Sequence, residues 1–293
     1  YSGYFGSIFH NFHANVNILD NGERNSSNIH NVNSQNILFL GDSITAGFEV
    51  NDDQTFVSVY NKLNKNSVGR NFGVRGHDTH AVIGSYLRLC KKITHKSVVY
   101  VMCWNDLIEN IDEQIYTELT YRYGRRFNGR ITQKRSDLFY RVLSFTRSKI
   151  ADNLSISTYA YYSFIHTLNR FFHDLNYGSN IKVFIPNEAM ITKTYNLLIE
   201  LAKNVSLNGA KLYVIPFPRI RNQEINIAYA KPLFKLLSNY KSNIKLIDLS
   251  TNLKNLVKRN NYELTDIIIK NDGHLSIHGH NIIGQILYNN IIP

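Results

Sequence analysis

The feature that most constrains the fold of this chain is a repeated alternation of short apolar runs with longer helical patterns, from residue 36 onward. The runs with strand character span residues 36–41, 68–74, 97–103, 210–217 and 243–250. Helical patterns are expected over residues 55–65, 79–93, 188–205 and 277–292. Continuous apolar strands separated by helices are typical of a parallel sheet that helices cover on both faces. The alternation therefore predicts an α/β fold.

Composition places the chain among globular proteins with a strongly basic balance. Of 293 residues, 43% are hydrophobic and 19% are charged, and no run approaches the ~18 apolar residues of a membrane-spanning helix. The formal net charge of +11 favours anionic partners in general: acidic polysaccharide, phospholipid surface or nucleic acid. The basic residues are scattered apart from one cluster at 124–135, and no nucleic-acid-binding motif is found. Nucleic acid is therefore not expected as a partner.

The chain is expected to form one domain with two additions. Residues 1–35, rich in Asn, Ser and His, predict an extended, mostly irregular lead-in. Residues 36–293 then form a single α/β domain, interrupted by a helical insertion at about 107–187 that is rich in Tyr and Phe. We interpret these aromatic side chains as packing the insertion against the core, with a lid or substrate-contacting surface as the alternative.

Two observations bear on the cellular compartment. The chain begins with Tyr rather than Met, which we interpret as a fragment or processed form that a signal peptide or anchor could have preceded. Cys90 and Cys103 both stand in apolar surroundings, which favours buried free thiols over a disulfide. The cysteines therefore leave the compartment open.

Ser43 is the first candidate for chemistry, because ligands of parallel α/β sheets bind beyond the carboxyl ends of the strands. It follows the first strand in the turn Gly-Asp-Ser, before a helix. A serine there can expose its hydroxyl at the sheet edge, and its backbone N–H lies near a helix N-terminus, which suits a nucleophile whose attack creates an oxyanion. Asp-Ser is also ordinary helix-capping chemistry, so the residue is either nucleophile or cap.

Three later segments supply further candidates. The stretch "NFGVRGHDT" (71–79) has two glycines that can leave backbone N–H groups exposed, although a plain turn explains them equally well. "VMCWND" places Asn105 and Asp106 after the third strand, where an Asn amide can hold an oxyanion or either residue can cap a helix. In "NDGHLSIHGH" (271–280), His274 is a candidate general base that Asp272 could orient.

The last segment also allows a competing interpretation. The side chains with spacing compatible with a metal site are His274, His278, His280 and Asp272. A zinc site would leave Ser43, the glycines and Asn105 without roles, so we expect no metal. We then interpret His278 and His280 as surface residues at the start of a helix.

Together these segments resemble the four sequence blocks of the SGNH (GDSL-type) hydrolase superfamily: "GDSIT", "NFGVRGHDT", "CWND" and "DGHLSIHGH". The resemblance covers about 36–106 and 188–290. Within the superfamily, the chain is similar to exported or membrane-associated members. It implies a flavodoxin-like three-layer α/β/α sandwich with no metal and no organic cofactor. It also implies Ser43 as nucleophile and His274 as base. The implied oxyanion donors are the backbone N–H groups of Ser43 and Gly76 and the side chain of Asn105.

The chain departs from the family pattern at two positions. Cys103 stands where Gly is usual in the third block, so we expect a narrower or reshaped pocket. Asn271 stands three residues before His274, where Asp is usual, so Asp272 is our choice for the residue that orients the base. If Asp272 points away, a Ser–His dyad braced by a carbonyl is the alternative.

The resemblance implies a serine esterase that forms an acyl-enzyme on Ser43 and hydrolyses short acyl esters, with O-acetyl groups on a carbohydrate as one substrate class. An O-acyltransferase acting on a cell-envelope polysaccharide, and a non-catalytic binding protein, are the alternatives. The expected partners are a small acyl ester or acylated saccharide. A further expected partner is a membrane or the cell envelope, through a segment absent from this chain, and an exported or envelope location is favoured over a cytoplasmic one.

Overall fold

The computed structural model describes residues 2–7, 12–26, 35–110, 185–221, 224–240, 243–269 and 273–291. The elements described below lie in one compact unit of the chain, which takes in residues 1–124 and 185–293. Of the helical insertion predicted at about 107–187, residues 111–184 lie outside the described residues. The insertion therefore stays a prediction.

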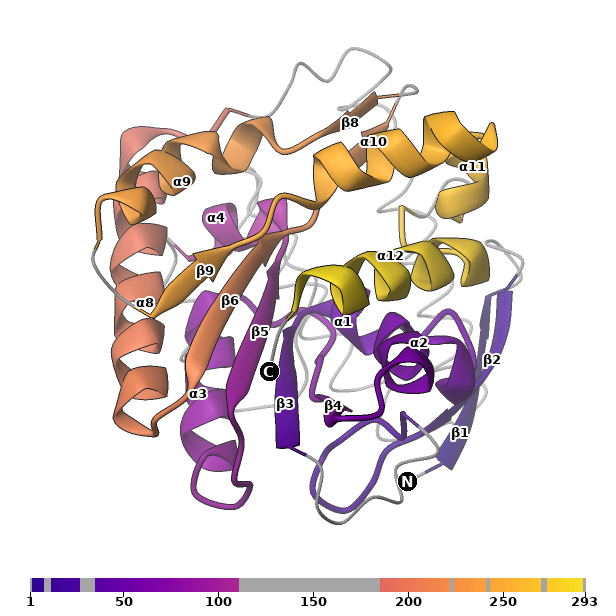
Figure 1. The fold of residues 1–293 in the computed structure, drawn as a ribbon, viewed down its shortest axis with the longest axis horizontal. Helices are drawn as coiled ribbons and strands as arrows, with labels where there is room; N and C mark the ends of the chain where they lie inside the picture. The colour runs from indigo at the N-terminus through magenta and orange to yellow at the C-terminus, as the bar shows by residue number, and fades with distance from the viewer. Residues whose placement is uncertain are drawn as a thin grey trace, which may run out of the picture. The chain divides into compact units, whose positions relative to one another are not determined.

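A five-stranded parallel sheet forms the centre of this unit (Figure 1). Its strands are β3 (Gln35–Gly41), β4 (Ser67–Asn71), β5 (Ser97–Met102), β6 (Lys211–Pro216) and β9 (Ile244–Leu246). They lie side by side in the order β4-β3-β5-β6-β9. Counted along the chain, this is the 2-1-3-4-5 strand order of flavodoxin-like folds. The predicted α/β fold is confirmed.

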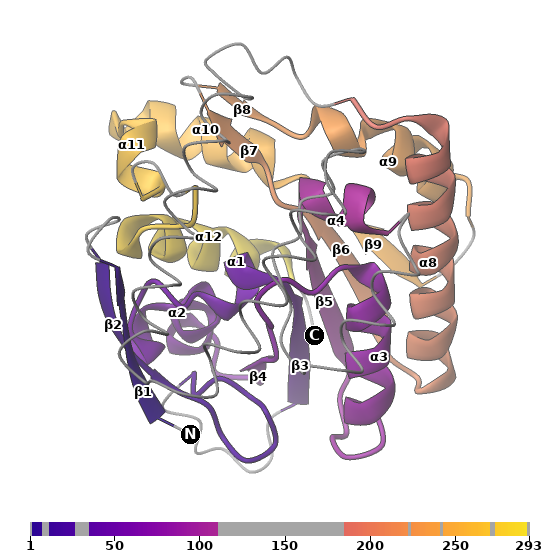
Figure 2. The same ribbon diagram turned by 180° about the vertical axis from the view of Figure 1, so that it is seen from behind.

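Helices cover both faces of the sheet, which explains why its central strands are continuously apolar (Figures 1 and 2). On one face pack α2 (Phe56–Leu63), α10 (Leu249–Asn260) and α12 (Ile277–Asn290). The strand residues that contact them alternate along each strand: Ile37, Phe39, Val99, Val101, Tyr213 and Ile215. The opposite face carries α3 (Thr79–Leu89) and α8 (Glu188–Leu207).

Shorter elements complete the described unit. The helices and turns are α1 (Ser43–Ala46), η1 (Asp52–Gln54), α4 (Trp104–Glu109), η2 (Ala228–Ala230), α9 (Lys231–Ser238) and α11 (Leu264–Ile267). The hairpin of β7 (Arg219–Arg221) and β8 (Glu224–Asn226) follows the sheet strand β6. None of the helices that the structure describes combines the length and apolar character that crossing a bilayer requires.

One predicted strand is partly wrong. The run 243–250 forms only three residues of strand, β9, because Asp248 caps a helix that begins at Leu249. The Asp248 carboxylate accepts the backbone N–H of Ser250 at 2.7 Å. The apolar side chains after β9 therefore lie on a helix, where the sequence pattern alone does not distinguish them from a strand.

The lead-in is more ordered than the sequence predicts. Strands β1 (Ser2–Ser7) and β2 (Phe12–Asn17) form an antiparallel hairpin. Beyond it, the backbone N–H of Arg24 donates to the Asn71 carbonyl oxygen at 2.8 Å, at the end of β4. The Arg24 side chain is buried. The lead-in thus reaches the edge of the sheet where the candidate residues lie.

Candidate active site

Ser43 lies directly beyond the carboxyl end of β3, as the first residue of α1. The capping role belongs to its neighbour Asp42, whose carboxylate accepts the backbone N–H of Ile44 at 2.9 Å. The Ser43 hydroxyl oxygen instead lies 2.9 Å from Nε2 of His274. A serine hydroxyl within hydrogen-bond distance of an imidazole nitrogen is the arrangement of an activated nucleophile and its base.

His274 reaches Ser43 across 231 residues of sequence because the segment before α12 is held in place by backbone pairing. Its carbonyl oxygen accepts the Ile269 N–H at 2.8 Å, and Leu275 forms an antiparallel bridge with Ile268. Ser276 then caps α12. The backbone that carries the imidazole is therefore held on one side by Ile268 and Ile269 and on the other by the start of α12.

The second ring nitrogen of His274 faces a residue that the sequence did not indicate. Nδ1 lies 3.7 Å from Oε1 of Glu49, and the Glu49 side chain is only 2% exposed. Asp272, the acid expected from the sequence, lies outside the described residues. An available signal was the acidic Glu49 within the apolar stretch "GFEV", close after Ser43.

Gly47 ends α1 and starts the loop that carries Glu49. It adopts a left-handed conformation, with φ of 61°. An added Cβ there would come within 3.0 Å of the His280 ring, so a larger residue would be strained and crowded. The turn after the nucleophile helix thus depends on glycine.

Gly76 lies in the segment after β4, and this segment runs next to the end of β3, the strand that precedes Ser43. The N–H of Val74 donates to the Gly41 carbonyl oxygen at 3.0 Å, just before the Ser43 turn. Gly76 has φ of 77°, a left-handed conformation that suits glycine. Gly73 has a different role, because an added Cβ would lie 2.3 Å from the backbone nitrogen of Ala46. Gly73 is a packing glycine, and Gly76 stays the candidate oxyanion donor.

Asn105 follows β5 and lies in the first turn of α4. The capping contact is made by Asp106, whose carboxylate accepts the N–H of Cys103 at 2.9 Å and the hydroxyl of Tyr100 at 2.7 Å. Among the described residues, the half-buried Asn105 side chain has no hydrogen-bond partner. Its amide is therefore available to a ligand.

The strand order brings the candidates that follow β3, β4 and β5 together at the carboxyl-terminal end of the sheet. β3 lies between β4 and β5, and all three strands run parallel. Ser43, Gly76 and Asn105 thus follow three adjacent strands at their carboxyl ends, where ligands of such sheets bind. This arrangement can support nucleophilic attack with donors on both sides of the nucleophile.

Cys103 lies beneath the nucleophile turn. Its side chain is buried, and its thiol donates to Asp42 at 3.4 Å. Burial, with the charges of Asp42 and Asp106 nearby, raises the pKa of the Cys103 thiol. Burial likewise raises the pKa of Asp106 well above its usual range, together with the charges of Asp42 and Glu109. Cys103 therefore packs against the turn that carries Ser43, and the narrower or reshaped pocket expected from the sequence stays a prediction.

The other two histidines of the last segment point to different partners. His280 is buried, and its Nδ1 accepts the backbone N–H of Phe56 at 3.1 Å. Its interpretation as a surface residue is wrong: burial lowers its pKa to about 3. His278 packs edge-on against Tyr262, with ring centroids 4.4 Å apart. Within the described part of the chain, no three His, Cys, Asp or Glu side chains gather closely enough to hold a metal.

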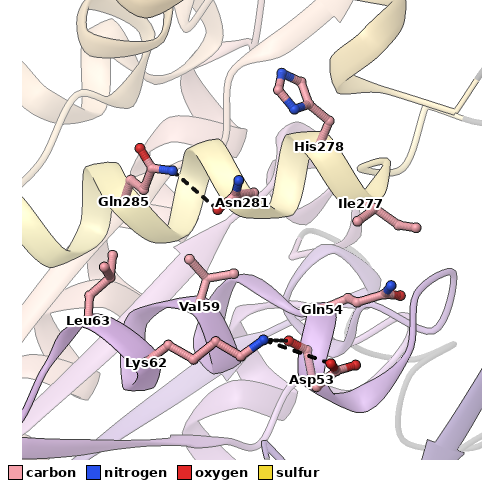
Figure 3. A pocket seen from close by; sticks show the side chains of 9 residues that line it. All are labelled: Asp53, Gln54, Val59, Lys62, Leu63, Ile277, His278, Asn281 and Gln285. Atoms are coloured by element: carbon pink, nitrogen blue, oxygen red, sulfur yellow. Dashed lines mark hydrogen bonds and ion pairs between the residues drawn. The ribbon is translucent and has the colours of Figure 1, made fainter.

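A pocket of 540 Å³ lies between α2 and α12, apart from the Ser43–His274 pair (Figure 3). Its lining residues are Asp53, Gln54, Val59, Lys62, Leu63, Ile277, His278, Asn281 and Gln285. Within the lining, the Lys62 ammonium donates to the Asp53 carbonyl oxygen at 2.7 Å. The lining includes none of the candidate catalytic side chains.

Trp104 and Arg219 form a pair next to Asn105. The Arg219 guanidinium lies over the Trp104 ring, 4.8 Å from its centroid. Both side chains are half-buried. They follow adjacent strands, β5 and β6, so they border the same edge of the sheet as Asn105. An aromatic ring and a cation thus border the candidate site.

No protein-family model matches the chain, and no curated protein matches its sequence. Similar solved structures include a lipolytic protein of the G-D-S-L family from Veillonella parvula, 13% identical, with a TM-score of 0.47 and coverage of 88% of this chain and 98% of that one. Another, described as a putative lipolytic protein of that family from Desulfitobacterium hafniense, is 12% identical, with a TM-score of 0.49 and coverage of 88% and 100%.

A third is a variant of an acetyl-xylooligosaccharide esterase from Geobacillus, 13% identical, with a TM-score of 0.47 and coverage of 88% and 95%. Two of these neighbours are described as G-D-S-L proteins, the class that the sequence blocks resemble. Likeness at these identities concerns the fold. The chemistry of a protein depends on the side chains of its site rather than on its fold.

Proposed function

We propose that this protein is a serine ester hydrolase of the SGNH type. The observation that carries the proposal is the 2.9 Å approach of the Ser43 hydroxyl oxygen to Nε2 of His274. His274 takes the hydroxyl proton while Ser43 attacks the ester carbonyl carbon. The protonated imidazole then gives that proton to the leaving alcohol, and an acyl-enzyme forms on Ser43. Water, deprotonated by His274, releases the acid and regenerates the hydroxyl.

The carbonyl oxygen gains negative charge during the attack and needs donors. In the proposal, these are the backbone N–H groups of Ser43 and Gly76 and the amide of Asn105. Their placement after three adjacent strands supports this role. So does the Asn105 amide, which has no partner among the described residues. Donors that are positioned before the reaction stabilise the oxyanion without reorganisation.

For the substrate, we propose short acyl esters, with O-acetyl groups on a carbohydrate as the natural class. Trp104 and Arg219 are compatible with a polar alcohol portion of the substrate beside the site, because a guanidinium stacked on an aromatic ring forms a polarised surface that suits oxygen-rich groups. The net charge of +11 is compatible with an anionic saccharide.

The test of the hydrolase proposal is Ser43→Ala, assayed with p-nitrophenyl acetate and with a fluorophosphonate probe. Turnover is expected to fall by at least about 10³-fold, since the nucleophile and base act as a unit. Covalent labelling is expected to disappear, while the circular dichroism melting curve stays that of the wild type. Ser238→Ala is the matched control, because that exposed serine lies on α9 away from the sheet edge.

Undiminished turnover in Ser43→Ala would contradict the hydrolase. If fluorophosphonate does not label the wild-type protein, a non-catalytic binding protein is favoured instead.

For the substrate, an acetylated oligosaccharide is incubated with enzyme and the mixture is followed by mass spectrometry. Release of acetate supports hydrolysis, whereas gain of an acetyl group by a second, unacetylated oligosaccharide indicates transfer. Neither change, with p-nitrophenyl acetate still cleaved, would exclude this substrate class.

A further inference from the structure

We propose that Glu49, rather than Asp272, is the acid that orients His274 and balances its charge, and that buried Arg24 of the lead-in holds Glu49 in position. The inference rests on the proposed function, since it assigns a positioning residue to the same site. It also makes the lead-in a structural part of the active site, although the sequence suggested an irregular approach to the domain.

The first observation is the geometry of the imidazole. Nε2 lies 2.9 Å from the Ser43 hydroxyl oxygen, and Nδ1 lies 3.7 Å from Oε1 of Glu49. The two contacts use opposite nitrogens of one ring, as a relay of nucleophile, base and acid requires. A carboxylate facing Nδ1 favours the tautomer that leaves Nε2 free to accept the serine proton.

The second observation is the burial of the carboxylate. The side chain of Glu49 is 2% exposed and that of His274 is 19% exposed. A carboxylate removed from water is retained where charged or hydrogen-bonding partners compensate for lost hydration. His274 is such a partner when it carries the proton taken from Ser43.

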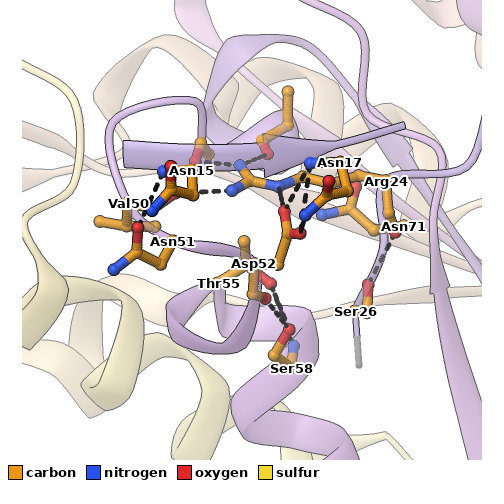
Figure 4. A network of polar contacts seen from close by, with 12 residues as sticks. Asn15, Asn17, Arg24, Ser26, Val50, Asn51, Asp52, Thr55, Ser58 and Asn71 are labelled. Carbon is orange, nitrogen blue, oxygen red and sulfur yellow. Dashed lines mark hydrogen bonds and ion pairs between the residues drawn. The ribbon is translucent and has the colours of Figure 1, made fainter. Parts of the chain in front are cut away.

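The third observation is the scaffold around the loop (Figure 4). Arg24 donates to backbone carbonyl oxygens on both sides of Glu49, those of Ala46, Gly47 and Val50, the last at 2.6 Å. Its Nε also pairs with Asp52 at 3.2 Å. The loop cannot move without breaking these bonds. Glu49 is therefore carried by a fixed backbone rather than a free surface loop.

The fourth observation is the balance of charge around Glu49. Arg24 faces both Asp52 and Glu49: burial lowers the pKa of Arg24, and the attraction of the two carboxylates opposes that shift. Asp52 compensates Arg24 through their direct ion pair. His280, on α12, stays neutral because burial lowers its pKa to about 3. The group of Arg24, Asp52 and Glu49 thus contains one cation and two carboxylates, a balance that favours an imidazolium at His274.

The decisive variant is Glu49→Gln, which keeps the size of the side chain and removes its charge. The expected loss in kcat/KM for p-nitrophenyl acetate is roughly 10²- to 10⁴-fold, as for other acids of such relays. The acid limb of the pH profile should also move to lower pH, because loss of a nearby negative charge lowers the pKa of the imidazole. A merely structural role would lower the amplitude and leave that limb in place.

Two carboxylate controls accompany this variant. Asp53→Asn removes a charge from the same region at an exposed position paired with Lys62, and it should change neither rate nor limb. Asp272→Asn removes the acid expected from the sequence, and it should keep the wild-type limb. Loss of activity with a shifted limb in Asp272→Asn, while Glu49→Gln behaves as wild type, would overturn the inference.

A second readout does not require activity. The pKa of His274 is measured by NMR titration of its ring signals in the Ser43→Ala background, with and without Glu49→Gln. The inference requires a lower pKa when Glu49 is neutralised, and an unchanged value overturns it. Because this measurement is independent of turnover, it decides the role of Glu49 even if fluorophosphonate labelling disproves the hydrolase. If Glu49→Gln does not fold, the Asp272→Asn titration decides: a lowered pKa there overturns the inference.

Discussion

Ser43 and Asn105 are available for chemistry because each has a neighbour that takes over helix capping. Asp42 accepts the N–H of Ile44, and Asp106 accepts the N–H of Cys103. Asp and Asn at a strand-to-helix turn are ordinary capping residues, so the sequence could not separate the two roles. In the structure, the acids cap the helices, the serine meets His274, and the Asn105 amide stays without a partner among the described residues.

A prediction at this scale concerns Asn105→Ala. Loss of one oxyanion donor should lower kcat by roughly 10²- to 10³-fold. Stability should change little, because the half-buried amide makes no hydrogen bond with the described residues. Steady-state kinetics with p-nitrophenyl acetate and a thermal melt measure the two effects. A wild-type kcat would remove Asn105 from the proposed oxyanion site.

At the scale of elements, the lead-in and the loop after α1 behave as one unit. Asn17 of β2 donates through its side chain to Asp52 at 2.6 Å, and Arg24 pairs with the same carboxylate (Figure 4). Asn71, at the end of β4, adds a bond from its side chain to the Thr45 carbonyl oxygen at 2.9 Å. These contacts tie the hairpin, the nucleophile helix and the sheet edge together.

A prediction for this unit concerns Arg24→Met. It leaves Asp52 and Glu49 without their buried cation, so the free energy of unfolding should fall by about 3–5 kcal/mol. Lys62→Ala is the control, because the Lys62–Asp53 pair is exposed by 51% and 59% and should contribute less than about 1 kcal/mol. Urea denaturation of the three proteins measures the difference. Equal losses in the two variants would show that the Arg24 network carries no special stability.

At the scale of the whole described unit, the last helix, α12, packs against α2 near the start of the domain. His280 of α12 accepts the N–H of Phe56 across 224 residues and stacks on the Phe56 ring, with centroids 5.7 Å apart. The same helix is preceded by His274. The packing of α12 against α2 therefore delivers the base to the nucleophile.

This packing has a pH signature. Burial lowers the pKa of His280 to about 3 from 6.5, so the unfolded state binds the proton more readily. The stability from this site is thus complete above pH 6.5 and is lost as pH falls toward 3. Between pH 7 and pH 5, the free energy of unfolding should therefore fall by about 2 kcal/mol because of this histidine. His280→Asn keeps an acceptor for Phe56 and does not titrate.

Denaturation curves at several pH values compare the two proteins. The wild type should lose stability toward pH 5 more steeply than His280→Asn, although the variant also loses ring stacking and is less stable at pH 7. The comparison concerns the slope, because the two proteins differ only at position 280. Parallel slopes would show that His280 is protonated without cost in the folded protein.

The α/β class and the main strands could be predicted from the sequence by itself, and Ser43, Gly76, Asn105 and His274 could be named there as candidate site residues. Ser43, Gly76 and Asn105 come after the apolar strands β3, β4 and β5, whereas His274 lies between α11 and α12. Strand 243–250 was only partly right, because a short apolar run also suits a helix. The order of the lead-in was missed although β2 alternates the buried apolar residues Ala14 and Val16 with polar neighbours, a pattern typical of a strand with one buried face.

Only the tertiary structure decided which side chains meet. The approach of His274 to Ser43 spans 231 residues, and no local pattern determines such a distance. Glu49 faces His274 because α1 ends in a left-handed glycine and Arg24 holds the following carbonyl groups. The acid of a Ser–His–acid site needs only to lie beside the second ring nitrogen of the histidine. Its position in the chain therefore cannot be deduced from the spacing of a motif.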